Sequence, residues 1–310
     1  MQTTEQNGAV TTINVDEVYG GWEQWLFLTS DNHFDSIYCN RDIMRAHFDE
    51  AKRRSARIYI FGDWYDAMQG RYDNRRAAPE LRPEYERRED YYDAIVNDSA
   101  DWLAPYAPNI DIISDGNHEL GVLKNANTNI VDRLVHEHLN RKYGGAVRHG
   151  GYGGWVRFLF DEGNHKQSVR LKYYHGSGGE APVTRGAIQT ARQAVYLPDA
   201  NIVVNGHSHN MYYIPISRER LGNKGCQYLD IQHHIRIPGY KQAYGDGQSG
   251  WEVTRGGVPK PIGSVWVRLY YDNKIIKIQV TPEIVAPEPV SISADVLYNG
   301  AVYDDDGYAE

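Results

Sequence analysis

The chain has few cysteines and no long apolar run. Its two cysteines, Cys39 and Cys226, are too few for a disulfide framework or for a zinc site built on thiolates. The longest apolar runs, WLFL at 25–28 and IVV at 202–204, are far shorter than the roughly 20 residues of a membrane-spanning helix. The N-terminus lacks both the basic residues and the apolar segment of a signal peptide. We therefore expect a soluble, cytoplasmic protein with no membrane partner.

Basic residues are missing from both ends of the chain. Residues 1–21 carry three acids and residues 286–310 carry six, whereas residues 22–285 hold 33 basic and 32 acidic residues. The net charge of −8 therefore describes the ends, and it does not exclude an anionic substrate for the rest. We predict a polar N-terminal extension (1–21), one folded domain (22–285) and an acidic C-terminal tail (286–310).

Apolar runs rich in β-branched and aromatic residues predict strands. They lie at 25–30, 57–62, 110–114, 155–160, 168–174, 201–205, 211–216, 264–271 and 274–280. Helical periodicity falls between the early runs, at 40–55, 83–103 and 126–143. Strand and helix alternate in the first half, and the second half is rich in strands. This order indicates a layered α/β body with stacked sheets.

Five polar clusters each follow one of these strands. They are Asp31-Asn32-His33, Asp63-Trp64-Tyr65-Asp66, Asp115-Gly116-Asn117-His118-Glu119, His175-Gly176 and Gly206-His207-Ser208-His209. In open α/β sheets, ligand-binding groups collect where the strands end. Each cluster alone is a weak signal, because a short motif turns up by chance. The set of five, each after a strand, points to one site.

The residue types in these clusters suit a pair of metal ions. Carboxylate and imidazole donors suit Mn, Fe, Zn, Co or Ni. The absence of thiolate donors argues against a structural zinc site. One carboxylate can bridge two cations about 3.5–4 Å apart. Two divalent ions, set against two carboxylates and one hydroxide, leave about one positive charge, which suits an anionic phosphoryl group.

The five motifs D-x-H, G-D-x-x-D, G-N-H-E, H-G and G-H-x-H, in this order, resemble the calcineurin-like metallophosphoesterases over about residues 24–280. The resemblance implies a four-layer α/β/β/α sandwich of two mixed sheets flanked by helices. It also implies two divalent ions, Mn²⁺ foremost, with Fe, Zn, Ni, Co or Mg as alternatives. The stretch after the last motif resembles a group of phage and prokaryotic phosphoesterases whose substrates are mostly unassigned.

The same resemblance assigns roles to residues. One ion is assigned to Asp31, His33, Asp63 and His209, and the other to Asp63, Asn117, His175 and His207, with Asp63 bridging. His118 would contact the phosphate or protonate the leaving oxygen, and Asp66 would orient His118. Glu119 either steadies the site or has a structural role behind it.

One position departs from the family pattern, because many members that act on protein phosphates have an arginine where this chain has Asp115. Another base would then have to contact the phosphate. Arg71, Arg75 and Arg76 follow the second motif and are candidates, although a solvated helix with i,i+4 ion pairs is the alternative for this segment. Arg236, Tyr240 and Lys241 could line a substrate groove, or could belong to a loop that connects strands.

The sequence thus predicts an enzyme that hydrolyses a phosphoester with a metal-activated water. A phosphodiester in nucleic acid or a nucleotide is the favoured substrate, given the missing arginine, the near-neutral domain and the arginine-containing segment. The alternatives are a phosphomonoesterase acting on phosphoproteins or small molecules, and a non-catalytic binding module of the same fold.

Overall fold

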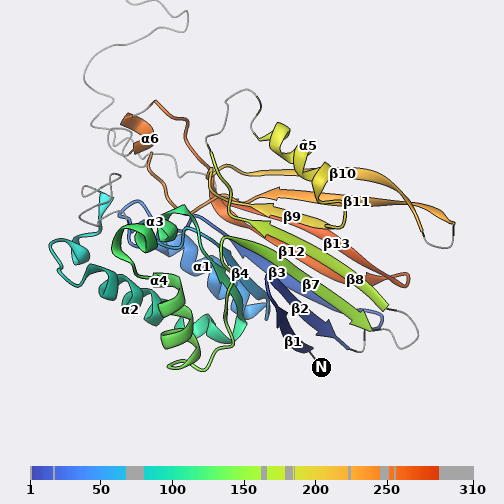
Figure 1. Cartoon of the computed structure of the whole chain (residues 1–310), viewed down its shortest axis with the longest axis horizontal. Coiled ribbons are helices and arrows are strands. Elements are labelled where there is room, and N and C mark those ends of the chain that lie inside the picture. The colour runs from blue at the N-terminus through green and yellow to red at the C-terminus, as the bar shows by residue number, and fades with distance from the viewer. Residues whose placement is uncertain are drawn as a thin grey trace, which may run out of the picture.

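Two β-sheets with helices outside them make up the computed structural model (Figure 1). The structure describes residues 2–16, 18–67, 80–161, 166–178, 184, 186–222, 225–244, 251–254 and 256–285. The acidic tail predicted at 286–310 and the candidates Arg71, Arg75 and Arg76 lie outside these residues.

The smaller sheet has six strands in the order β13-β12-β3-β4-β5-β6. These are β3 (Glu23–Thr29), β4 (Arg57–Phe61), β5 (Ile110–Ser114), β6 (Arg148–His149), β12 (Ile262–Asp272) and β13 (Ile275–Val285). The four strands from β3 to β6 run parallel, while β12 pairs antiparallel with both β3 and β13. The carboxyl ends of β3, β4 and β5 therefore share one edge of the sheet.

The larger sheet has seven strands in the order β1-β2-β7-β8-β9-β11-β10. These are β1 (Gln2–Asn7), β2 (Val10–Val15), β7 (Gly153–Asp161), β8 (Lys166–Tyr174), β9 (Ile202–Asn205), β10 (Tyr212–Leu221) and β11 (Gln227–Arg236). Three neighbouring pairs are parallel (β2 with β7, β8 with β9, β9 with β11) and the other three are antiparallel, so this sheet is mixed as well. The segment 1–21 supplies β1 and β2, and β2 buries Ile13 and Val15 against the rest of the sheet.

The helices are α1 (Arg41–Arg53), α2 (Tyr91–Leu103), α3 (Asn117–Ala126), α4 (Ile130–Asp132), α5 (Ala187–Tyr196) and α6 (Trp251–Thr254). Short 3₁₀ segments, η2 (Pro83–Tyr85) and η3 (Ala104–Asn109), and a π-helical segment, η4 (Arg133–Asn140), complete them. Helix α1 shows why these segments are helical: the Asn40 side chain accepts from the Ile43 amide at its start, and Met44, Phe48 and Ala51 bury one face.

Two apolar cores lie on opposite faces of the smaller sheet. Phe27, Ile58 and Ile60 point toward the helices, whereas their strand neighbours Leu28 and Tyr59 point toward the larger sheet. This alternation is the period-2 pattern of a strand whose two faces are both covered. Helices α1 to α4 cover the outside of the smaller sheet, and α5 lies against the larger one (Figure 1). The chain thus has the predicted α/β fold of two mixed sheets flanked by helices.

Candidate metal centre

The ends of five strands deliver the predicted ligands. Asp31 and His33 follow β3, Asp63 follows β4, and Asn117 follows β5, all in the smaller sheet. His175 follows β8, and the loop with His207 and His209 follows β9, both in the larger sheet. The structure brings all seven together, because these strand ends meet where the two sheets face each other.

The backbone is unusual at this edge. Asp31, His33, Asp63, His207 and His209 all have positive φ, between 49° and 74°, although none is glycine. Residues with a Cβ rarely adopt this left-handed conformation, and a cluster of them is typical of functional sites. Five of the seven residues at the sheet edges therefore hold a left-handed backbone conformation, which sets the direction of their side chains.

One group of potential ligands consists of Asp31, His33 and His209. Their ligand atoms lie within 4.8 Å of one another. The two imidazole Nε2 atoms are 3.2 Å apart, and His209 Nε2 is 3.7 Å from Asp31 Oδ1. The group joins the two sheets, since Asp31 and His33 come from the smaller and His209 from the larger.

A second group consists of Asp63, His175 and His207, again with ligand atoms within 4.8 Å of one another. His175 Nε2 is 3.0 Å from Asp63 Oδ2. The side-chain oxygen of Asn117 lies 2.7 Å from His207 Nδ1 and 3.2 Å from His175 Nε2, and so completes the group. Asp63 also lies within 4.8 Å of His33, in the position of a bridge between the two groups.

Two of the histidines have a nitrogen fixed by a partner outside the group. His33 Nδ1 donates to Asp66 Oδ1 at 2.8 Å, and His175 Nδ1 donates to the carbonyl of Phe61 at 2.9 Å. With the proton on Nδ1, the lone pair of Nε2 faces the other ligands in each case. This is the tautomer in which an imidazole binds a metal.

The electrostatics of the site call for cations. Burial opposes a charge on His175, yet the nearby Asp63 carboxylate outweighs burial and raises the pKa of His175 to about 10. Burial lowers the pKa of His33 to about 4 and that of His209 to about 3, so both offer neutral imidazoles at neutral pH. The two buried carboxylates, Asp31 and Asp63, together with the neutral imidazoles of His33 and His209, fit a pair of divalent ions.

His118 and Asp66 lie beside the two groups, but their contact differs from the prediction. Asp66 Oδ1 accepts a hydrogen bond from His33 at 2.8 Å and lies 3.9 Å from His118 Nδ1. His118 Nδ1 donates instead to the main-chain carbonyl of Asp66, at 2.5 Å, and its Nε2 is 3.8 Å from Asp63 Oδ2. Asp66 therefore orients both histidines, one through its side chain and the other through its backbone.

Glu119 supports the site from behind. Its buried carboxylate accepts hydrogen bonds from three backbone amides, those of Asp63, Tyr65 and Gly116. It thereby ties the loop after β4 to the start of α3. The motif alone leaves open whether Glu119 steadies the site or has a structural role, and these contacts combine the two.

All three substrate-groove candidates are buried, and two of them, Tyr240 and Lys241, have their polar atoms enclosed by other side chains. The side chain of Tyr240 is fully buried, and its hydroxyl lies 2.8 Å from His47 Nδ1 under α1. Lys241 is buried between Asp66 and Glu80. Both positions correct the expectation that these side chains face a substrate. Their segment packs along the loop of the D-x-H motif, where the Tyr240 amide donates to the Asp31 carbonyl.

Arg236 ends β11 beside the His207–His209 loop. Its guanidinium donates to the Gly206 carbonyl at 2.8 Å and to Ser208 Oγ at 3.1 Å. It also donates to Gln189 Oε1 at 2.9 Å and to the Tyr212 hydroxyl at 3.2 Å. These partners are all uncharged, no carboxylate of the described residues pairs with it, and its buried Nε has no hydrogen-bond partner. Arg236 therefore brings an unneutralised positive charge to the edge of the site. The sequence pattern favours a loop for this stretch. The polar residues within β11 interrupt the apolar run that would have predicted a strand.

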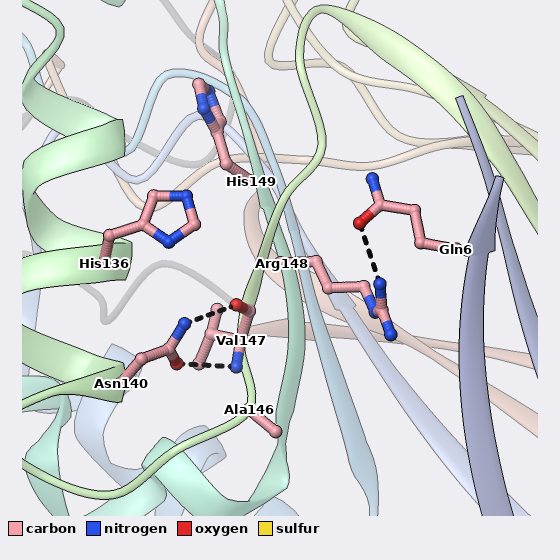
Figure 2. A pocket seen from close by; sticks show the side chains of 7 residues that line it. All are labelled: Gln6, His136, Asn140, Ala146, Val147, Arg148 and His149. Atoms are coloured by element: carbon pink, nitrogen blue, oxygen red, sulfur yellow. Dashed lines mark hydrogen bonds between the residues drawn. The ribbon is translucent and has the colours of Figure 1, made fainter. Parts of the chain in front are cut away.

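Asp115, the departure from the family pattern, does not point at the ligands. Both of its carboxylate oxygens are 2.9 Å from His149 Nε2. His149 and His136 border a separate hollow of about 420 Å³ (Figure 2). The Asp115 charge is thus balanced locally and does not repel an anion at the centre.

Solved structures share the arrangement of the chain only loosely. A protein described as a predicted phosphoesterase from Streptococcus pneumoniae is 13% identical (TM-score 0.30), with 84% of this chain and 90% of that chain covered. GAP50, the anchor in the inner membrane complex of Plasmodium, is 12% identical (TM-score 0.43; 85% and 84% covered). Vacuolar protein sorting 29 from Cryptosporidium parvum is 10% identical (TM-score 0.37; 85% and 100% covered).

No protein-family description and no curated protein matches the sequence. At TM-scores below 0.5, the structural likenesses carry no functional information for this chain. What the chain shows by itself is an α/β fold of two mixed sheets with groups of side chains that could hold metal ions. In the described residues, no helix is long and apolar enough to cross a membrane.

Proposed function

We propose that the chain is a phosphoesterase that uses two divalent metal ions, with a phosphodiester in nucleic acid or a nucleotide as its substrate. The observation that carries this proposal is the pair of ligand groups linked by Asp63. Divalent ions held there would activate a water molecule for attack on phosphorus and would neutralise the phosphoryl group. Mn²⁺ is our first choice of ion, because the donors are carboxylate, amide and imidazole without thiolate.

His118 is the proposed acid. Its Nδ1 proton is committed to the Asp66 carbonyl, so Nε2 is the nitrogen that faces the site. In the imidazolium form, a proton on Nε2 can stabilise the phosphoryl oxygens and then pass to the leaving oxygen. The contact with the Asp66 carbonyl holds the ring in that orientation.

The local charge favours a diester over a monoester. A phosphodiester carries one negative charge, whereas a monoester at neutral pH carries nearly two. Among the described residues beside the ligands, the Arg236 guanidinium faces no carboxylate, while the Lys241 ammonium is neutralised by two carboxylates. This small number of unneutralised bases suits the phosphodiester, which carries the smaller negative charge. Arg71, Arg75 and Arg76 remain proposed phosphate contacts.

Two synthetic esters test the proposal. The purified protein is loaded with Mn²⁺ and assayed on bis(p-nitrophenyl) phosphate and on p-nitrophenyl phosphate, with a chelator as control. We expect faster, chelator-sensitive hydrolysis of the diester, followed by cleavage of a short oligonucleotide or a cyclic nucleotide. Faster hydrolysis of the monoester would favour the phosphomonoesterase. Two bound ions without hydrolysis of either ester would favour a binding module.

A further inference from the structure

Lys241 is a buried lysine that the proposed chemistry does not use. Its side chain is 7% exposed, and its ammonium group donates to Asp66 Oδ1 at 3.0 Å and to Glu80 Oε2 at 2.7 Å. A cation in this position is unable to meet a substrate, because both carboxylates and the protein around them enclose it. Its effect must be sought in what it holds.

What Lys241 holds is the partner of a proposed metal ligand. Asp66 Oδ1 accepts from the Lys241 ammonium and also from His33 Nδ1, at 2.8 Å. A single oxygen thus links the lysine to the imidazole whose Nε2 faces Asp31 and His209. The other ligand group is held differently, since His175 Nδ1 donates to the Phe61 carbonyl.

The backbone around Lys241 is fixed to the same loop as the ligands. The Tyr240 amide donates to the Asp31 carbonyl at 3.1 Å, and the Gln242 amide donates to the Tyr38 carbonyl at 2.8 Å. Between them, Lys241 itself forms an isolated β-bridge with Cys39. The lysine is therefore held in place relative to the loop that carries Asp31 and His33.

The charges show what its removal would do. Without the ammonium, Asp66 Oδ1 would lose the Lys241 donor, and no cation would lie between the buried carboxylates of Asp66 and Glu80. Like charges in one buried site repel each other, so the two side chains would move apart. That movement displaces the oxygen that fixes the tautomer and the direction of His33.

We propose that Lys241 is a positioning residue that, through Asp66 and His33, sets the affinity of the metal position formed by Asp31, His33 and His209. The position formed by Asp63, Asn117, His175 and His207 lies outside its influence. This inference rests on the metal site of the proposed function, and it assigns control of one ion to a residue that touches neither ion.

Two single-site backgrounds separate the positions. His207→Ala is designed to keep only the first position, and His209→Ala only the second. Lys241→Met is then added to each, and Mn²⁺ affinity is measured by isothermal titration calorimetry. We expect Mn²⁺ binding to weaken by about 10–100-fold in the His207→Ala background, the usual effect of removing a group behind a metal ligand. In the His209→Ala background we expect a change of less than about twofold.

Three further variants guard against a merely structural effect. Lys241→Arg keeps the charge and should weaken binding less than Lys241→Met. Arg57→Met breaks another largely buried ion pair, with Asp111 at the far end of β4 and β5, and should leave Mn²⁺ affinity unchanged in both backgrounds. Should Lys241→Met fail to fold, the double variant Lys241→Met/Glu80→Gln removes one charge of each sign. It still takes the Lys241 donor from Asp66, so it should show a smaller loss of Mn²⁺ affinity, again confined to the His207→Ala background.

The outcomes are distinguishable. Equal weakening in both backgrounds, no weakening in either, or the same pattern for Arg57→Met would overturn the role of Lys241 and leave the proposed function standing. A wild-type protein that is folded but binds no Mn²⁺ would refute the proposed function itself.

Discussion

At the scale of single residues, a hydrogen bond from one ring nitrogen fixes how each of three histidines is oriented at this centre. Because Nδ1 donates to a partner, Nε2 is the nitrogen that faces the other side chains of the centre. His33 donates to a carboxylate, and His175 and His118 donate to main-chain carbonyls. A main-chain carbonyl is present whatever the side chain, whereas the Asp66 carboxylate belongs to a side chain and is itself paired with Lys241. Substitutions should therefore be able to loosen His33 without affecting the other two rings.

Substitutions at Asp63 and His118 should separate metal binding from turnover. Asp63→Asn should lower the affinity for both ions, because a neutral amide bridges two cations poorly. His118→Ala should keep about two ions per chain and lower turnover by about 10²–10⁴-fold, as expected for the loss of an acid. Elemental analysis after Mn²⁺ loading, together with the diester assay, measures both. Loss of metal in His118→Ala would contradict its role as an acid that binds no ion.

At the scale of elements, the start of α3 lies directly against the loop after β4. A Cβ on Gly116, the residue that begins this helix, would overlap the carboxylate and the amide nitrogen of Asp63. We expect Gly116→Ala to displace Asp63 and to reduce Mn²⁺ content below two per chain. Gly20→Ala, at a glycine with open space around it, is the matched control and should bind Mn²⁺ as the wild type does. Full Mn²⁺ content in Gly116→Ala would speak against the bridging position of Asp63.

Two buried histidines in strand β11 should make the stability of the folded state depend on pH. Burial lowers the pKa of both His233 and His234 to about 4, against about 6.5 in the unfolded chain. Between these values the unfolded state binds more protons, so the stabilisation is complete above pH 6.5 and is lost as the pH falls toward 4. Urea unfolding at pH 7 and pH 4.5 should show a smaller loss of stability in His234→Gln, by about 1–2 kcal/mol. An identical pH dependence in this variant would contradict the account.

The elements differ in how well the sequence predicts them. The buried runs 57–62 and 110–114 match β4 and β5 closely. A short, nearly continuous apolar run is typical of a strand in a parallel sheet that is covered on both faces. Helix α3 escapes prediction, since its first turn consists of the polar residues Asn117, His118 and Glu119. It forms because Glu119 accepts the backbone amide of Gly116 and closes the helix start.

The same contrast holds for the site. The seven side chains that the structure brings together were predictable from motifs at strand ends, which are local in sequence. The roles of Lys241 and Tyr240 could not be predicted in that way, because they depend on contacts that only the fold creates, with Asp66 and Glu80 for Lys241 and with His47 for Tyr240. A basic or aromatic side chain near a motif in sequence is equally compatible with a groove and with a buried ion pair.

At the scale of the whole molecule, each ligand group draws side chains from both sheets. An ion in either position would thus also join one half of the sandwich to the other. A ligand that binds only the folded state stabilises it by about 4 kcal/mol at a thousand times its dissociation constant. We expect the melting temperature to rise with Mn²⁺ concentration and to fall after chelation, in a thermal scan. Variants that lack both His207 and His209 should melt at the same temperature with and without Mn²⁺.

A centre that spans the two sheets has a consequence for the life of the protein in a cell. Where metal is scarce, the edge between β8, β9 and the smaller sheet would open more often than the rest, and proteases cut open states. The amount of the protein, and not only its activity, would then follow the supply of metal. Limited proteolysis with and without Mn²⁺ should show the first cuts in the loops after β8 and β9.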